Sequence, residues 1–258
     1  MKFKDLQKNW NQFGKEDPMW AIITRPGMEG GKWDKESFFE TGRKEINRTI
    51  RYLQLKSIQI PKGRALDFGC GIGRLTQALA PHFNQVYGVD IAPTMIEMAV
   101  SHNQYADKCQ YFLNEVDDLA LFEDQSFAFI YSNITLQHME PRYAKKYIAE
   151  FLRLLAPGGK LLFQLPGEQV VPEKSSLAMR VRIVLRHVFG NLPDQVYTRI
   201  KQLTNTFRQE PHMEMYGIPK EEVCKLLTRP GIQIVDITNN NNAGKSWISY
   251  QYLVSREE

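Results

Sequence analysis

The segment that decides the fold spans residues 64–75 and reads RALDFGCGIGRL. Its first half is apolar and predicts a buried strand, and its second half places Gly69, Gly71 and Gly73 ahead of a helical pattern. A loop without side chains lets backbone N–H groups approach a ligand closely, and the N-terminus of the following helix favours a negative group. The glycines alone allow two interpretations, a ligand-binding loop or a tight turn between strand and helix.

Short apolar strands alternate with helical patterns from residue 64 onward, apart from an interruption at 167–216. Strands separated by helices predict a parallel sheet that is covered on both faces. The last two strands are joined by the polar segment 239–245 and predict an antiparallel hairpin at the end of the sheet. The predicted strands span 64–69, 85–90, 109–113, 127–133, 160–166, 231–238 and 246–254, and the predicted helices among them span 72–83, 93–103, 143–155 and 219–228.

We therefore predict an α/β fold, a Rossmann-like seven-stranded mostly parallel sheet with helices on both faces, an N-terminal helical extension and a helical lid insertion. The extension contains helical patterns at 3–13 and 37–57, with a loop-like segment rich in Gly and Pro between them. The predicted divisions are the extension at 1–60, a ligand-binding core at 61–166, the lid at 167–216 and the C-terminal part of the core at 217–258.

Composition and charge exclude several classes of protein. Apolar residues make up 43% and charged residues 24% of the chain, which is ordinary for a folded domain and unlike a disordered one. The net charge of +4 is too small to indicate nucleic acid as a partner. The three scattered cysteines lack the spacing of a disulfide framework or a metal site, and no apolar run has the length of a membrane span or signal peptide. We expect a cytoplasmic protein without a metal, nucleic-acid or membrane partner, of open oligomeric state.

The residues around the glycines separate two kinds of cofactor loop. The dinucleotide fingerprint of nicotinamide dehydrogenases needs a third small residue where Arg74 stands. With Asp67 ahead of the glycines, the loop instead resembles that of the class I S-adenosylmethionine-dependent methyltransferases, in their small-molecule branch. The resemblance continues with Asp90 at the end of the second strand, NEVDDL after the third, LQHM after the fourth and LAPGG before the fifth. It covers residues 64–166 well and 219–255 loosely.

The resemblance implies S-adenosylmethionine as the cofactor and assigns residues to it. Asp90 would hold the ribose hydroxyls, since a diol offers two donors that one carboxylate can accept. Glu115 stands where the family has an aspartate that binds the adenine amino group, and Val116 lies beside it. Asp67 would shape the loop by accepting its N–H groups. The predicted cofactor-binding residues are Asp67, Gly69, Gly71, Gly73, Asp90, Ile91, Glu115, Val116 and Asn133.

The resemblance also implies methyl transfer to O or N of a small molecule, an in-line displacement that depends mainly on alignment. A base is needed only for a hydroxyl or a protonated nitrogen. His138 follows the fourth strand, where parallel sheets expose their ligand crevice, and is the candidate base; helix capping or packing under the cofactor is the alternative. Trp20, Arg182 and Arg186 are candidate acceptor contacts. The arginines would suit an anionic acceptor, with a solvated helix face as the alternative, whereas core packing is the alternative for Trp20.

Other functions stay open on the sequence alone. A protein or peptide methyltransferase, and a non-catalytic S-adenosylmethionine-binding protein on the same fold, would share these motifs. A nucleic-acid methyltransferase would carry an NPPY-type tetrad after the fourth strand, where SNIT stands instead. Methyl transfer leaves no obligatory catalytic motif, so the acceptor is not readable from the chain.

Overall fold

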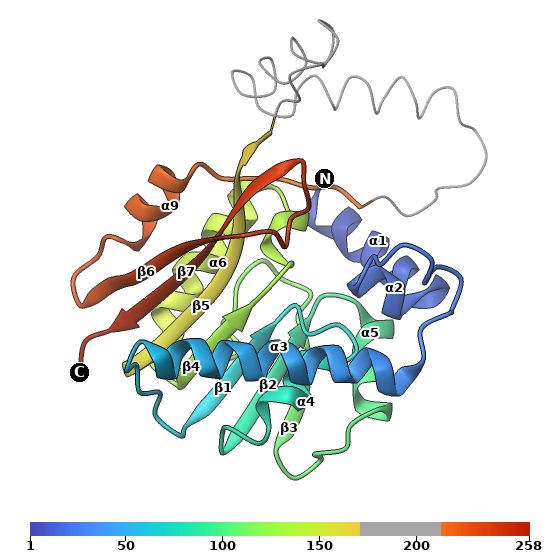
Figure 1. Cartoon of the computed structure of the whole chain (residues 1–258), viewed down its shortest axis with the longest axis horizontal. Coiled ribbons are helices and arrows are strands. Elements are labelled where there is room, and N and C mark those ends of the chain that lie inside the picture. The colour runs from blue at the N-terminus through green and yellow to red at the C-terminus, as the bar shows by residue number, and fades with distance from the viewer. Residues whose placement is uncertain (171–212) are drawn as a thin grey trace, which may run out of the picture.

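Figure 1 shows the computed structural model of the protein, which describes residues 1–170 and 213–258. A single sheet of seven strands runs through the fold, and helices lie on both of its faces. This arrangement confirms the predicted α/β class. The two helices that the sequence predicts within the lid, at 177–189 and 196–207, lie outside the described residues.

The strand order of the sheet is β3-β2-β1-β4-β5-β7-β6. The five strands from β1 to β5 are parallel, whereas β7 lies antiparallel between β5 and β6. The predicted C-terminal hairpin is therefore present. The order reverses between β1 and β4, which is where open α/β sheets form a ligand crevice. The strands are β1 (Arg64–Phe68), β2 (Gln85–Asp90), β3 (Cys109–Leu113), β4 (Phe127–Ser132), β5 (Leu155–Gln169), β6 (Ile232–Asn240) and β7 (Trp247–Arg256).

The described helices are α1 (Phe3–Glu16), α2 (Pro18–Ile22), α3 (Lys35–Leu55), α4 (Arg74–Leu79), α5 (Pro93–Ser101), the 3-10 helix η1 (Leu136–His138), α6 (Pro141–Leu154) and α9 (Lys220–Leu227). Helices α3 and α6 lie on opposite faces of the sheet (Figure 1). Side chains of α3 and α4 pack in one core, and those of α6 and α9 pack in another. Successive residues of β1 follow this division, because Ala65 joins the first core and Leu66 joins the second. None of these helices is both long enough and apolar enough to cross a membrane.

The segment expected to be a loop between the N-terminal helices contains the short helix α2. The carboxylate of Asp17 accepts the backbone N–H of Trp20 at 3.3 Å and that of Gly31 at 2.9 Å. Pro18 begins the helix, at a position where its missing N–H leaves no hydrogen bond unmade. A side-chain cap and a proline thus form a helix in a stretch whose Gly and Pro content indicated a loop.

Strand β5 is longer than predicted at both of its ends. It begins at Leu155 rather than 160, and it continues to Gln169, so the predicted lid would start inside the strand. Glu168 and Gln169 pair with β7 after an irregularity in the register. The chain returns to the same region after the undescribed residues, since the N–H of Tyr216 donates to the carbonyl of Gln137 at 2.7 Å. The described residues that follow this part of the chain therefore lie beside η1.

A buried ion pair ties α3 to the sheet. Nη1 of Arg74 lies 2.9 Å from Oε2 of Glu45, and the two side chains are 7% and 18% exposed. The other carboxylate oxygen of Glu45 accepts from the Tyr131 hydroxyl at 3.0 Å and from the Asn133 amide at 2.6 Å. A single carboxylate therefore joins α3 to α4 and to the end of β4.

We expect Glu45→Ala to lower the free energy of unfolding by about 3 kcal/mol, because it leaves the buried Arg74 guanidinium without its counter-charge. Urea unfolding followed by circular dichroism measures this change. The matched control is Glu36→Ala, which removes an ion pair to Arg43 whose side chain is 41% exposed. Exposed pairs contribute less than about 1 kcal/mol. Equal losses in the two variants would contradict the role of burial.

Candidate functional site

A cavity lies at the carboxyl ends of β1, β2 and β4, beside the point where the strand order reverses. It encloses about 100 Å³. Helices α1 and α2 form part of its wall through Phe3, Leu6, Trp10 and Ile22, and most of the remaining wall is also apolar. The polar side chains that line it are Arg74, Asp90, Asn114, Asn133, Thr135, His138 and Tyr147.

The glycine loop follows β1 and forms one wall of the cavity. Gly69 has a φ of +78°, and a Cβ atom placed on it would lie 2.2 Å from the Thr135 side chain. Only glycine fits at this position, for reasons of both space and backbone conformation. Gly69 and Gly71 line the cavity, whereas Gly73 caps the N-terminus of α4 without lining it. The loop is therefore built so that backbone rather than side chain meets a ligand.

Asp67 lies within β1, is 1% exposed and does not line the cavity. Its carboxylate accepts the Thr76 hydroxyl at 2.7 Å, and burial raises the pKa of Asp67 to about 7. This residue was expected to accept the N–H groups of the loop. The hydrogen-bond partner of Asp67 differs from that expectation. Asp67 accepts from the Thr76 hydroxyl, whereas the N–H of Gly71 in the loop donates to Asp90.

The Asp90 carboxylate stands at the end of β2 and lines the cavity. Oδ2 accepts the N–H of Gly71 at 2.9 Å, and Oδ1 accepts the N–H of Ala92 at 2.9 Å. Burial raises the pKa of this carboxyl group, and the two backbone hydrogen bonds oppose that rise. Ile91, the next residue, also lines the cavity. Asp90 thus fixes the glycine loop against β2 and presents its carboxylate to the cavity.

The residues after β3 differ from the prediction by one position. Asn114 is buried and lines the cavity, and its amide donates to the carbonyls of Val116 at 3.0 Å and Asp118 at 2.8 Å. Glu115 and Val116, predicted to bind the cofactor, do not line the cavity. The Glu115 carboxylate instead accepts from the Gln7 amide of α1 at 2.7 Å, and Val116 is 53% exposed. The prediction missed Asn114, although a polar residue directly after an apolar strand was a signal for it.

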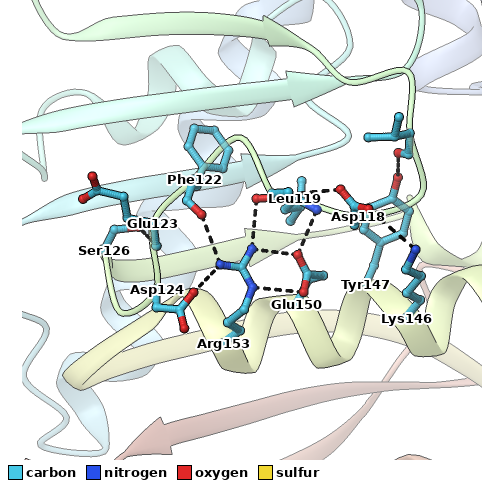
Figure 2. A network of polar contacts seen from close by, with 12 residues as sticks. Asp118, Leu119, Phe122, Glu123, Asp124, Ser126, Lys146, Tyr147, Glu150 and Arg153 are labelled. Carbon is cyan, nitrogen blue, oxygen red and sulfur yellow. Dashed lines mark hydrogen bonds and ion pairs between the residues drawn. The ribbon is translucent and has the colours of Figure 1, made fainter.

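Helix α6 holds the segment that follows Asn114. Figure 2 shows that the Arg153 guanidinium of α6 faces the backbone of this segment. It donates to the carbonyl oxygens of Leu119 at 3.0 Å and Phe122 at 3.1 Å. Glu150 of the same helix accepts the Leu119 N–H at 2.9 Å. The Arg153 guanidinium also contacts the carboxylates of Glu150 and Asp124, which raise its pKa. The segment between β3 and β4 is thus anchored to a rigid helix by side chains that meet its backbone.

The residues that follow β4 form the opposite wall of the cavity. Asn133, Ile134 and Thr135 line it in succession. The Asn133 amide is shared between the carboxylate of Glu45 at 2.6 Å and the amide of Asn242 at 2.9 Å. Glu45 belongs to the N-terminal extension and was not predicted as part of the site. It supports Asn133 without lining the cavity itself.

His138 lines the cavity and is 6% exposed. Its Nδ1 lies 2.8 Å from the carbonyl oxygen of Glu214, and its Nε2 lies 3.1 Å from the amide nitrogen of Gln137. Burial lowers the pKa of His138 to about 4, so the ring is neutral. The Trp10 ring contacts it edge-on at 5.2 Å between centroids. Both ring nitrogens are therefore engaged by the protein, which favours the packing alternative over a general base.

Of the other predicted acceptor contacts, Trp20 is the one that the structure describes, and it does not line this cavity. Trp20 lies on α2 and packs in the cluster of the N-terminal helices without lining the cavity, whereas Trp10 of α1 does line it. Trp33 is buried in the same cluster and donates to the carbonyl of Ile23. Arg182 and Arg186 lie outside the described residues, so their predicted role stays a prediction.

The low pKa of His138 predicts a pH dependence of stability. The ordinary pKa is 6.5 and the folded value is about 4, so the unfolded chain binds more protons between these values. Stability should therefore fall as pH drops from about 6.5 to 4, by at most about 1.4 kcal/mol per pH unit from this residue. Unfolding curves of the wild type and His138→Gln across this range measure the effect. The wild type should show the steeper slope; equal slopes would rule out a buried neutral histidine.

Comparison with known proteins adds to this geometry. Residues 66–163 match a family model described as a methyltransferase domain. The ubiquinone biosynthesis O-methyltransferase of Xanthomonas campestris is 33% identical over 105 residues, which are 40% of this chain and 43% of that protein. The malonyl-(acyl-carrier protein) O-methyltransferase of Methylococcus capsulatus is 29% identical over 162 residues, 62% of this chain and 53% of that protein. The chain thus spans about half the length of these curated relatives.

A solved structure extends the likeness to the whole fold. Magnesium protoporphyrin IX methyltransferase from Synechocystis PCC 6803, crystallised with bound SAH, aligns over 99% of both chains with a TM-score of 0.62 at 17% identity. The matched domain, the order of the motifs and the strand order lead to the same assignment. Residues 66–163 thus match a methyltransferase domain, and the fold and motif order of the chain resemble those of the class I S-adenosylmethionine-dependent methyltransferases.

Proposed function

We propose that the protein transfers the methyl group of S-adenosylmethionine to an oxygen or nitrogen atom of a small molecule. The observation that carries this proposal is the meeting of the glycine loop and Asp90 at one end of a cavity whose other walls are mostly apolar. A carboxylate and bare backbone suit the polar parts of the cofactor, and the apolar remainder suits an acceptor beside it. The matched methyltransferase domain and the named relatives support the same reaction class.

The residues at the polar end fit this cofactor. Each Asp90 oxygen accepts one backbone N–H, and an ionised carboxylate offers about four acceptor positions. About two positions therefore remain for the two hydroxyls of a ribose. At Gly69 and Gly71 the wall lacks side chains, so the amino-acid end of the cofactor can pack against backbone.

Cofactor entry requires the N-terminal helices to shift. Pockets for ligands of this size enclose roughly 300 to 1,000 Å³, and the cavity encloses about 100 Å³. Phe3, Leu6 and Trp10 of α1 occupy its outer side. Side-chain hydrogen bonds connect α1 to the core, among them the bond from Gln7 to Glu115 and that from the Thr94 N–H to Asn11. We therefore infer that α1 is a cover for the site, in line with the cap predicted for residues 1–60.

When bound, the cofactor supplies a methyl group on a sulfonium sulfur, which becomes a neutral thioether as the new bond to the acceptor forms. The protein must hold the acceptor atom in line with that carbon, and alignment of this kind lowers the barrier substantially. Trp10, His138 and Thr135 form the wall that would position the acceptor. We propose a positioning role for His138, because its Nε2 lone pair faces the Gln137 amide.

We also propose a chemical class for the small-molecule acceptor. Within the described wall the cation is Arg74, which is paired with Glu45. An anionic acceptor would therefore depend on Arg182 and Arg186, outside the described residues. An uncharged, largely apolar acceptor fits the described wall better. Incubation with methyl-labelled S-adenosylmethionine and separate pools of metabolites, protein and nucleic acid tests the reaction; label in the metabolite pool supports it, and label only in protein favours the peptide alternative.

Asp90→Ala should weaken binding of S-adenosylhomocysteine by about a hundredfold, because hydrogen bonds to a charged group contribute about 1.5 to 3 kcal/mol. Isothermal titration calorimetry measures the Kd. Glu115→Ala is the matched comparison, since Glu115 is an acid at the next strand end that does not line the cavity. Its Kd should stay within about twofold of wild type. Unchanged affinity in Asp90→Ala would refute the cofactor site, and a large loss in Glu115→Ala would restore the predicted adenine contact.

Trp10 should report the movement of α1. Binding of S-adenosylhomocysteine should change its fluorescence, because the ring lines the cavity and contacts His138. The change should disappear in Trp10→Phe while calorimetric binding persists. Trp33→Phe serves as control, since Trp33 is buried among the N-terminal helices away from the cavity wall. A signal that survives in Trp10→Phe would argue against a moving α1.

A further inference from the structure

A continuous row of buried polar groups runs behind the cavity wall, from Ile134 to His138. Oε1 of Gln164 accepts the backbone N–H of Ile134 at 3.0 Å. Nε2 of Gln164 lies 3.1 Å from Oε1 of Gln137, and Nε2 of Gln137 lies 3.1 Å from Nε2 of His138. Gln164 and Gln137 are 1% and 2% exposed. Buried amides are costly unless each of their groups is paired, so the row is specified by its bonds.

Two backbone groups at the ends of the row set the direction of every bond in it. The N–H of Ile134 can only donate, so the amide oxygen of Gln164 faces it and the amide nitrogen faces Gln137. Gln137 must then present its oxygen to Gln164 and its nitrogen to His138. At the other end, the carbonyl of Glu214 can only accept, so the proton of His138 lies on Nδ1. Flipping either amide would place two donors or two acceptors face to face.

Ile134 needs support because its backbone is strained. Its φ is +59°, in the left-handed region that a β-branched residue rarely adopts. This conformation has a consequence for the cavity. Successive residues of an extended strand point to opposite sides, whereas Asn133, Ile134 and Thr135 all line the cavity. The turn at Ile134 also brings Thr135 over Gly69, which can have no side chain there.

We propose that Gln164 is a positioning residue of this site. Its one amide has two arms: the oxygen holds the strained turn of Ile134, and the nitrogen, through Gln137, holds a donor against Nε2 of His138, whose proton the Glu214 carbonyl fixes on Nδ1. Gln164 itself does not line the cavity. The wall that faces the cofactor loop and the wall that faces the acceptor are thus set by one buried side chain of β5. The inference rests on the proposed function for the identity of the ligand, but not for the geometry of the two arms.

The first variant removes the Gln164 amide. The second variant makes the support of the Ile134 turn unnecessary. Gln164→Met keeps the length of the side chain and loses all of its hydrogen bonds. Ile134→Gly removes the need for support at the turn, because glycine adopts a positive φ without strain. The double variant therefore restores the turn arm and leaves the histidine arm broken. Ser249→Ala is the control, since Ser249 accepts from the same Gln164 nitrogen at 2.6 Å but does not line the cavity.

Two measurements read the two arms separately. Long-range ¹H–¹⁵N correlation spectra of protein with labelled histidine distinguish the two neutral tautomers, and His138→Gln identifies the signal among the five histidines. Calorimetry with S-adenosylhomocysteine gives the Kd. In wild type we expect the Nδ1–H tautomer. In Gln164→Met we expect that signal to change and the Kd to rise about tenfold, which corresponds to about 1.4 kcal/mol.

In the double variant the Kd should return to that of Ile134→Gly alone, while the changed tautomer signal persists. Ser249→Ala should alter neither readout even where it lowers the melting temperature, which separates positioning from stability. An unchanged His138 Nε2 signal together with a wild-type Kd in Gln164→Met would overturn the proposal, as would a double variant no better than Gln164→Met. If S-adenosylhomocysteine fails to bind wild type, the proposed function fails, and the tautomer spectra still test the histidine arm.

Discussion

The site depends on the reversal of strand order at β1. Strands β2 and β4 both lie next to β1, and the connections that leave β1 and β4 run to opposite sides of the sheet. The glycine loop, Asp90 and the turn after β4 therefore meet at one edge, where no connection fills the space between them. Asp90 exploits this closeness by accepting the N–H of Gly71 across the gap between β1 and β2. A different strand order would separate these groups and leave each of them an ordinary strand end.

The apolar character of the cavity is consistent with the proposed reaction. A sulfonium loses its positive charge during methyl transfer, so an environment that solvates charge poorly disfavours the reactant more than the transition state. The neutral state of His138 fits this environment, since a protonated ring would add a second positive charge beside the reacting atoms. Asp90 is the acid that lines the cavity. Its carboxylate accepts the N–H of Gly71 in the loop and the N–H of Ala92 after β2. Asp90 thus places its negative charge at the end where we propose that the ribose binds.

The parts of the fold that were predictable are those written in local patterns. Apolar strands, the glycine spacing and the acid after β2 were readable because each depends on neighbours within a few residues. Two features were harder to predict. The Glu115 carboxylate accepts from the Gln7 amide of α1, 108 residues away, and its contact with the cofactor stays a prediction. Helix α2 was missed because a cap by Asp17 outweighs the composition of the segment.

Polar residues inside apolar strands carry a signal of their own. Gln164 stands between Phe163 and Leu165 in a strand that is buried on both faces, and all three side chains are at most 1% exposed. An amide at such a position costs free energy unless both of its ends are paired, so its presence indicates partners before they are seen. The partners of Gln164 are Ile134 after β4, Gln137 of η1 and Ser249 of β7. They are not predictable from the sequence of β5 alone. What the sequence could have shown is the need for a network at this strand, and the strained turn of Ile134 shows what that network supports.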